Sequence, residues 1–236
     1  VQTPFIGLAI FIGLIAVIFL FSKLPKMITE ASSGTYAEAF KNRKLMQGVL
    51  GIFCYVGAEV AIGSYLVNYF LDMNLVSVIK ESEVMKFIAE TILNSGIAEF
   101  DNKAVVGVFV TFYWSGAMIG RFAGAYLTKI IKPGKVLALF ASIVVVLILV
   151  SINTNGLVSM WSILAVGLFN SIMFPTIFTL AINGIGHLKP KASGLLCTAI
   201  VGGALIPPTF GYLTDHIEFK KALLFISWVF TSHGLE

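Results

Sequence analysis

The chain has 236 residues, of which 58% are hydrophobic and only 12% are charged, with a formal net charge of +4. Soluble domains carry about 25% charged residues, so this composition excludes an ordinary soluble domain and predicts an integral membrane protein. The basic residues are dispersed among short connectors rather than gathered in one patch, which argues against nucleic acid as a partner.

Six apolar runs approach or exceed the length of about 20 residues that a membrane-spanning helix needs. In chain order they cover residues 4–21, 45–71, 104–128, 136–152, 160–183 and 192–214. A seventh run, 222–231, is too short to cross a bilayer unaided and predicts a truncated last helix. We expect helices throughout, because lipid offers open backbone groups no hydrogen-bond partner.

The connectors predict an orientation. Basic residues concentrate in 22–44, 129–135 and 189–191, and these connectors are expected on the cytoplasmic side. The connector 72–103 is acidic and is expected outside. Its apolar residues recur at helical spacing and predict a short surface helix; they are Val84, Phe87, Ile88 and Ile92.

The runs 4–21 and 136–152 are almost featureless and are typical of peripheral helices, whereas the other four carry polar residues. Glu59 lies deep in the run 45–71. A carboxylate at bilayer depth costs about 2.5 kcal/mol or more, so such a group usually faces a bundle interior or a water-filled cavity. We expect Glu59 to face the interior; the alternative is a structural carboxylate hydrogen-bonded to a neighbouring helix.

Glycines repeat every four residues in the run 104–128, at Gly116, Gly120 and Gly124. Small residues at this spacing let two helix backbones approach closely in lipid. The pattern predicts close packing, and it leaves open whether these glycines also serve a gating movement.

The run 192–214 holds Gly202 and Gly203, followed by Pro207 and Pro208. Each proline removes a backbone donor and clashes with the preceding turn, so we expect this helix to be kinked or locally unwound. Transporters use broken helices at their binding sites, but a purely structural kink is the alternative. The segments 116–128 and 203–215 also resemble each other, as inverted-topology repeats or chance would explain.

Three motifs carry a resemblance to a known family. They are Ile119-Gly120-Arg121-Phe122 with Lys135-Val136-Leu137-Ala138, then Phe174-Pro175-Thr176-Ile177-Phe178, then the segment 200–208 from Ile200 to Pro208. Together they resemble the fucose–galactose–proton symporter family of the major facilitator superfamily, over nearly the whole chain.

The resemblance implies an all-α integral membrane protein with twelve helices in two six-helix bundles. Residues 1–21 would be the sixth helix, 22–44 the cytoplasmic linker between bundles, and 45–236 the C-terminal bundle with its last helix truncated. The N-terminal six-helix bundle is absent from this sequence, and we expect it as the chain's partner.

The function that the resemblance implies is secondary active transport of a hexose of the fucose, glucose or galactose type. Transport would proceed by alternating access in the cell inner (plasma) membrane, coupled to protons or sodium and without another cofactor. The alternatives are a carrier of another small polar solute and a non-functional transporter fragment. The sequence lacks the common enzyme motifs and any metal-ligand cluster, so we expect neither an enzyme nor a metal site.

The candidate substrate-binding residues are Glu59, Tyr65, Asn68, Asn170 and Phe174. Tyr65 and Asn68 share one helical face, and Asn170 and Phe174 share another. Amides pair with sugar hydroxyls and aromatic rings contact the C–H face of a sugar, although asparagine also links helices in membranes. For Arg121, near the cytoplasmic end of its run, a gating or structural role is favoured over substrate contact.

Overall fold

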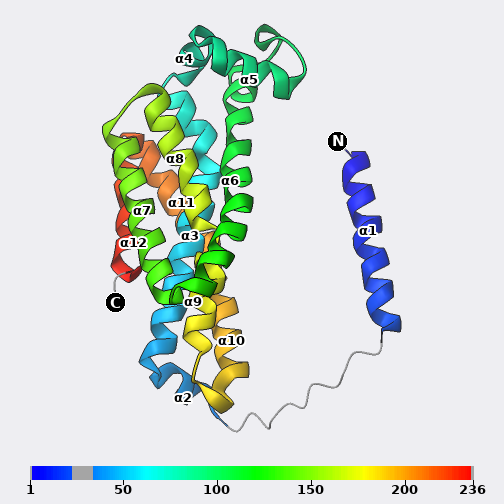
Figure 1. Cartoon of the computed structure of the whole chain (residues 1–236), viewed down its shortest axis with the longest axis vertical. Helices are drawn as coiled ribbons and strands as arrows, with labels where there is room; N and C mark the ends of the chain where they lie inside the picture. The colour runs from blue at the N-terminus through cyan, green and yellow to red at the C-terminus, as the bar shows by residue number, and fades with distance from the viewer. Residues whose placement is uncertain (1, 23–33, 235–236) are drawn as a thin grey trace. The chain divides into compact units, whose positions relative to one another are not determined.

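The computed structural model describes residues 2–22 and 34–234, and within these ranges the chain forms helices and no strands (Figure 1). It divides into two compact units, residues 1–32 and residues 33–236. The first unit contains α1 (Gln2–Phe21), whose described side chains are all exposed. The helix predicted for 4–21 is therefore confirmed, and its assignment as a sixth transporter helix stays a prediction.

The second unit is a helical bundle. Apart from the short helices at its two ends, its helices are α3 (Arg43–Asp72), α6 (Asn102–Ile130), α7 (Pro133–Asn153), α8 (Gly156–Asn170), α9 (Met173–Ile182), α10 (Lys189–Thr198), α11 (Gly202–His216) and α12 (Phe219–Gly234). In the described part of the chain, five stretches are long and apolar enough to cross a membrane, at 43–72, 102–130, 133–153, 156–182 and 186–216. They match the second to the sixth predicted runs.

The long helices begin at residues suited to that position. Asn42 accepts a hydrogen bond from the Leu45 amide at 3.1 Å at the start of α3, and Asp101 accepts one from Ala104 at 2.8 Å at the start of α6. Pro133 opens α7, where its missing N–H costs nothing. These caps stand at the ends of the apolar runs, so chain-local chemistry sets the helix boundaries.

Two of the five stretches are interrupted. α8 and α9 are separated at Ser171–Ile172, four residues before Pro175, which has no N–H to offer the Ser171 carbonyl and whose ring crowds that carbonyl. The predicted span 160–183 is confirmed as the stretch 156–182, and the break within it is a feature that its apolar composition did not indicate. α10 and α11 are joined by a single 3₁₀ turn, η3 (Ala199–Val201).

The winding of the run 192–214 does change locally, but at residues 199–201 and not at the prolines from which we predicted it. Pro207 and Pro208 both lie inside α11, and the 3₁₀ turn precedes Gly202. At Gly202 the α11 backbone lies directly against the carbonyl of Phe53 on α3, leaving no room for a side chain. Close packing of the two helices coincides with the change in helical winding.

The predicted surface helix in the connector 72–103 is confirmed as α5 (Glu83–Leu93), preceded by α4 (Leu75–Glu81) and followed by the turn η1 (Ile97–Glu99). Figure 1 shows α4 and α5 together at one end of the bundle, with α2 and α10 at the other. In α5, Met85 and Ala89 are buried, whereas Val84 and Phe87 are exposed.

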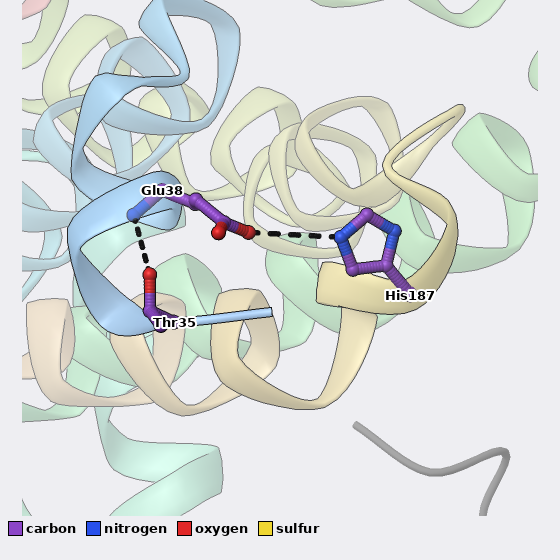
Figure 2. A network of polar contacts seen from close by, with 3 residues as sticks. All are labelled: Thr35, Glu38 and His187. Carbon is purple, nitrogen blue, oxygen red and sulfur yellow. Dashed lines mark hydrogen bonds and ion pairs between the residues drawn. The ribbon is translucent and has the colours of Figure 1, made fainter. Parts of the chain in front are cut away.

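At the opposite end, α2 (Tyr36–Lys41) packs onto the turn η2 (Gly186–Leu188) between α9 and α10 (Figure 2). Thr35 accepts the Glu38 amide at 3.3 Å, and the Glu38 carboxylate lies 3.7 Å from Nε2 of His187. Ala39 is fully buried in the same contact. The end of the predicted linker 22–44 is thus a folded part of the bundle.

The most extensive helix pairs in the bundle are α6 with α8 and α11 with α3. Gly120 lies against the carbonyl of Leu168, and Gly116 approaches the same residue. Gly124 packs on Ile172, and Gly203 packs on Val56. Each of the two similar segments therefore brings glycines against a neighbouring helix, α8 in the case of α6 and α3 in the case of α11.

Candidate functional site

One pocket of the bundle, with a volume of about 710 Å³, is bordered by α3, α6, α7 and α9 and by the break between α8 and α9. Its complete lining is Tyr55, Glu59, Arg121, Ala125, Thr128, Pro133, Ser171, Ile172, Phe174, Pro175, Thr176 and Thr179. Since the lining runs from the middle of α3 to the first residue of α7, the pocket extends toward the α6–α7 connector.

Glu59 is half-buried and lines this pocket, as the cost of a carboxylate in lipid predicted. Its carboxylate interacts with the hydroxyl of Tyr55, one helical turn earlier on α3, and with the charge of Arg121 on α6. Arg121 is exposed into the same pocket. The structure thus gathers an acid and a base across one cavity.

Most hydroxyl groups in the pocket lining already donate a hydrogen bond to a backbone carbonyl. Thr176 donates to the Ile172 carbonyl at 2.7 Å, Thr179 to Pro175 at 2.8 Å, and Ser171 to Leu168 at 2.8 Å. These oxygens keep lone pairs for a ligand. With the Glu59 carboxylate they make the pocket rich in acceptors, which suits a solute with several O–H donors.

Behind the pocket lies a buried polar group of three residues. The Tyr55 hydroxyl donates to the Asn170 carbonyl at 2.8 Å, and the Asn170 side-chain amide donates to the Tyr113 hydroxyl at 3.3 Å. The side-chain oxygen Oδ1 of Asn170 has no hydrogen-bond partner among the described residues. Asn170 is fully buried and does not line the pocket, although it contacts Tyr55, which does.

The other candidate residues divide between the pocket and its surroundings. Phe174 is half-buried in the lining. Asn68 is exposed and lies nine residues from Glu59 on α3, about 14 Å along the helix axis. Tyr65 packs edge to face on Phe210, with 5.3 Å between ring centroids. The structure therefore brings Glu59, Arg121 and Phe174 together, and it places Tyr65 and Asn68 outside this pocket.

The predicted glycines and one of the two prolines have packing positions. Gly116, Gly120 and Gly124 face α8 and Ile172 of the α8–α9 break. Gly202 and Gly203 face α3, and Pro207 is buried in α11 while Pro208 is exposed. Sequence reasoning did not select Tyr55, Ser171, Thr176 or Thr179. Tyr55 was the one with a usable signal, because it lies four residues before Glu59 and so shares its helical face.

Among the described residues, no three His, Cys, Asp or Glu side chains gather as a metal site would require. Glu59 is the one carboxylate in the pocket lining. Whether a proton or a sodium ion serves here stays a prediction.

The chain is similar to known transporters, although no family model matches it. It is 39% identical over 227 residues to a glucose/galactose transporter of Brucella abortus, covering 95% of this chain and 50% of that protein. It is 41% identical over 229 residues to a putative glucose/galactose transporter of Helicobacter pylori, covering 97% and 50%. An L-fucose-proton symporter of Escherichia coli is 30% identical over 223 residues, covering 91% and 45%.

Among solved structures, a crystal structure of the major facilitator superfamily transporter FucP in the outward conformation matches with a TM-score of 0.76 and 26% sequence identity. That match covers 99% of this chain and 53% of FucP. The chain spans about half the length of the relatives it matches. These relatives are transporters and not enzymes, which confirms the predicted class.

Proposed function

We propose that this chain forms the C-terminal bundle of a carrier for a hexose. The proposal is supported by its similarity to sugar transporters of the major facilitator superfamily over about half of their length. The chain is a multi-pass membrane protein with the fold of about half of such a transporter. We place it in the cell inner membrane, as predicted from the sequence.

The observation that carries the proposal is the pocket of Glu59, Arg121 and the α8–α9 break. A half-buried acid at the middle of α3 that faces an open cavity favours a functional role over a packing role. The broken helix beside it leaves backbone at membrane depth, which is tolerated where it borders protein or a cavity. Both features fit a solute-binding site between two bundles.

The sugar would bind through several kinds of contact. Its hydroxyls would donate to Glu59 and to the hydroxyl oxygens of Thr176 and Thr179, and accept from Arg121. Phe174 offers an aromatic edge or face to the apolar side of the ring. Asn170 would become reachable only if Tyr55 moved away, and Tyr65 and Asn68 would take part from another level of the central cavity.

The second wall of the site would come from an N-terminal six-helix bundle. The present pocket is open, and apolar side chains are exposed along α6 at Trp114, Met118, Phe122 and Tyr126. These four residues recur every four positions and form one stripe on the helix. Alternating access would follow from rocking of the two bundles about the shared cavity.

Coupling to a proton or to sodium is proposed to act at Glu59 or at acidic residues of the other bundle. A carrier of another small polar solute is the second candidate, favoured by Arg121. Its fixed positive charge in the pocket would suit an anionic solute as well as a neutral sugar.

Counterflow in proteoliposomes tests the proposal. The chain is reconstituted together with a complementary N-terminal bundle, loaded with unlabelled sugar, and offered labelled glucose, galactose or fucose. Exchange of one hexose for another supports a hexose carrier, since a channel does not exchange solute for solute. Exchange of only anionic solutes would overturn the hexose assignment in favour of the second candidate.

A further inference from the structure

The hydroxyl of Tyr55 has one proton and two acceptors within reach. One is the Asn170 carbonyl, to which it donates at 2.8 Å, and the other is the Glu59 carboxylate. We propose that Tyr55 is a positioning residue that couples the state of Glu59 in the pocket to the helix break at Ser171–Ile172.

The Asn170 carbonyl is the last main-chain acceptor of α8. In an uninterrupted helix it would accept the amide of Phe174, but α8 ends at Asn170 and α9 begins at Met173. The Tyr55 hydroxyl takes this acceptor instead, from a different helix and in a buried setting. A buried carbonyl without a partner is costly, so this bond stabilises the present geometry of the break.

Glu59 competes for the same proton. Hydrogen bonds to an ionised carboxylate are roughly twice as strong as those between neutral groups, so an ionised and unoccupied Glu59 draws the Tyr55 hydroxyl away from Asn170. A neutral Glu59, or one engaged by a ligand, releases the hydroxyl to Asn170. An ionised, unoccupied Glu59 therefore leaves the Asn170 carbonyl without its donor, whereas a neutral or liganded Glu59 keeps the Tyr55–Asn170 bond that stabilises the break.

The charged and titratable groups facing Glu59 are few. Tyr55 lies on its own helix, and Tyr113 and Arg121 come from α6. The α8–α9 segment contributes Asn170 and hydroxyl groups, none of which carries a charge. Arg121 is the one cation in the pocket lining, and an ion pair with it would also release Tyr55. The competition is thus confined to residues that variants can remove one at a time.

The position of α9 should therefore depend on the state of Glu59 in the pocket. α9 carries Phe174, Thr176 and Thr179 of the pocket wall, so a change at the break moves part of that wall. Its use in a transport cycle rests on the proposed function, whereas the coupling of Glu59 to the break does not.

Hydrogen exchange of residues 171–179 tests the coupling in this chain, held in lipid nanodiscs. Exchange is measured from about pH 4 to about pH 9, a range that spans ordinary and buried carboxyls, and is corrected for the intrinsic rate. In the wild type, protection should fall by about threefold to tenfold as pH rises, the range expected for one net hydrogen bond. Glu59→Gln should keep high protection at every pH.

Tyr55→Phe should show low protection at every pH, because the Asn170 carbonyl then has no donor in either state. Tyr113→Phe is the matched control: it removes a neighbouring buried hydroxyl that does not reach the Asn170 carbonyl, and it should keep the pH dependence. Wild-type pH dependence in Tyr55→Phe, or in Glu59→Gln, would overturn the coupling. Failure of sugar exchange would overturn the proposed function and leave these results standing.

Discussion

The backbone of Gly120 lies directly against the carbonyl oxygen of Leu168, at the crossing of α6 and α8. A methyl group at residue 120 would also lie 2.5 Å from the Ser171 hydroxyl, beside the helix break. The space that a side chain at residue 120 would fill is therefore occupied by the neighbouring main chain, and the two helices can meet only because residue 120 has no side chain.

Gly120→Ala should destabilise the bundle by about 1–3 kcal/mol, the usual cost of overpacking, because a carbonyl on a rigid helix cannot yield as a side chain can. Gly107→Ala on the same helix is the matched control, since no described atom lies within 4 Å of its added methyl group. Denaturant unfolding in detergent measures both. Equal stability of the two variants would contradict the packing role of Gly120.

Glu59→Gln should lower exchange of the transported solute by about tenfold or more while leaving the amount of inserted protein unchanged. The amide keeps the shape of the carboxylate but cannot accept charge-assisted hydrogen bonds, which contribute about 1.5–3 kcal/mol each. Glu218→Gln, at an exposed carboxylate paired with Lys221, is the control. Normal exchange with unchanged pH or ion dependence would remove Glu59 from the mechanism.

Arg121→Gln should separate the two candidate solutes. For a neutral sugar the loss of one donor should lower affinity several-fold, whereas for an anionic solute it should nearly abolish binding, because the pocket would keep only the negative Glu59. Arg121→Lys preserves the charge without the planar guanidinium, so its affinity should lie between those of the wild type and Arg121→Gln. Counterflow at varied solute concentration measures the change, and unaltered affinity would place Arg121 outside the binding site.

Leu188→Ala should release α2 from the bundle, whereas His187→Ala should not. Leu188 is buried beneath Gly34, while the neighbouring His187–Glu38 pair has both side chains 54% exposed. Exposed ion pairs contribute about 0–1 kcal/mol, but truncating a buried leucine costs about 2–5 kcal/mol. Limited proteolysis of the segment 34–42 reports the release. Greater cleavage in His187→Ala than in Leu188→Ala would reverse this ranking.

The chain by itself, reconstituted as a monomer, should take up no sugar. The pocket is lined by this bundle alone, and the apolar stripe of Trp114, Met118, Phe122 and Tyr126 on α6 is exposed. Adding a complementary N-terminal bundle should restore exchange. Uptake in vesicles that contain this chain alone measures the prediction, and sugar accumulation there by the monomer would contradict it.

Much of the architecture could be predicted from the sequence, because the length and polarity of an apolar run are local properties. Five predicted runs reappear as the five stretches able to span a membrane, and α5 appears in the connector where helical spacing indicated it. The inward position of Glu59 followed from the same reasoning, since lipid penalises a carboxylate wherever it lies in the chain.

The membership of the site could not be predicted in the same way. Glu59 and Phe174 meet in one pocket, but Asn68 lies too far along α3, and the ring of Tyr65 is packed against Phe210, with its hydroxyl against Gly211. Helical spacing tells which residues share a face, but it does not tell at which level another helix crosses that face. The break at Ser171–Ile172 was not predicted. Pro175 entered the sequence analysis only as part of a family motif, although it has no N–H to donate to the Ser171 carbonyl.

By itself, the sequence determined that this chain is a helical membrane protein with an acid facing its interior, because those properties depend only on the cost of polar groups in lipid. The tertiary structure alone decided that Tyr55 meets the Asn170 carbonyl, 115 residues later in the chain. Such a contact depends on how helices pack, and packing is set by the whole set of side chains between them rather than by either residue.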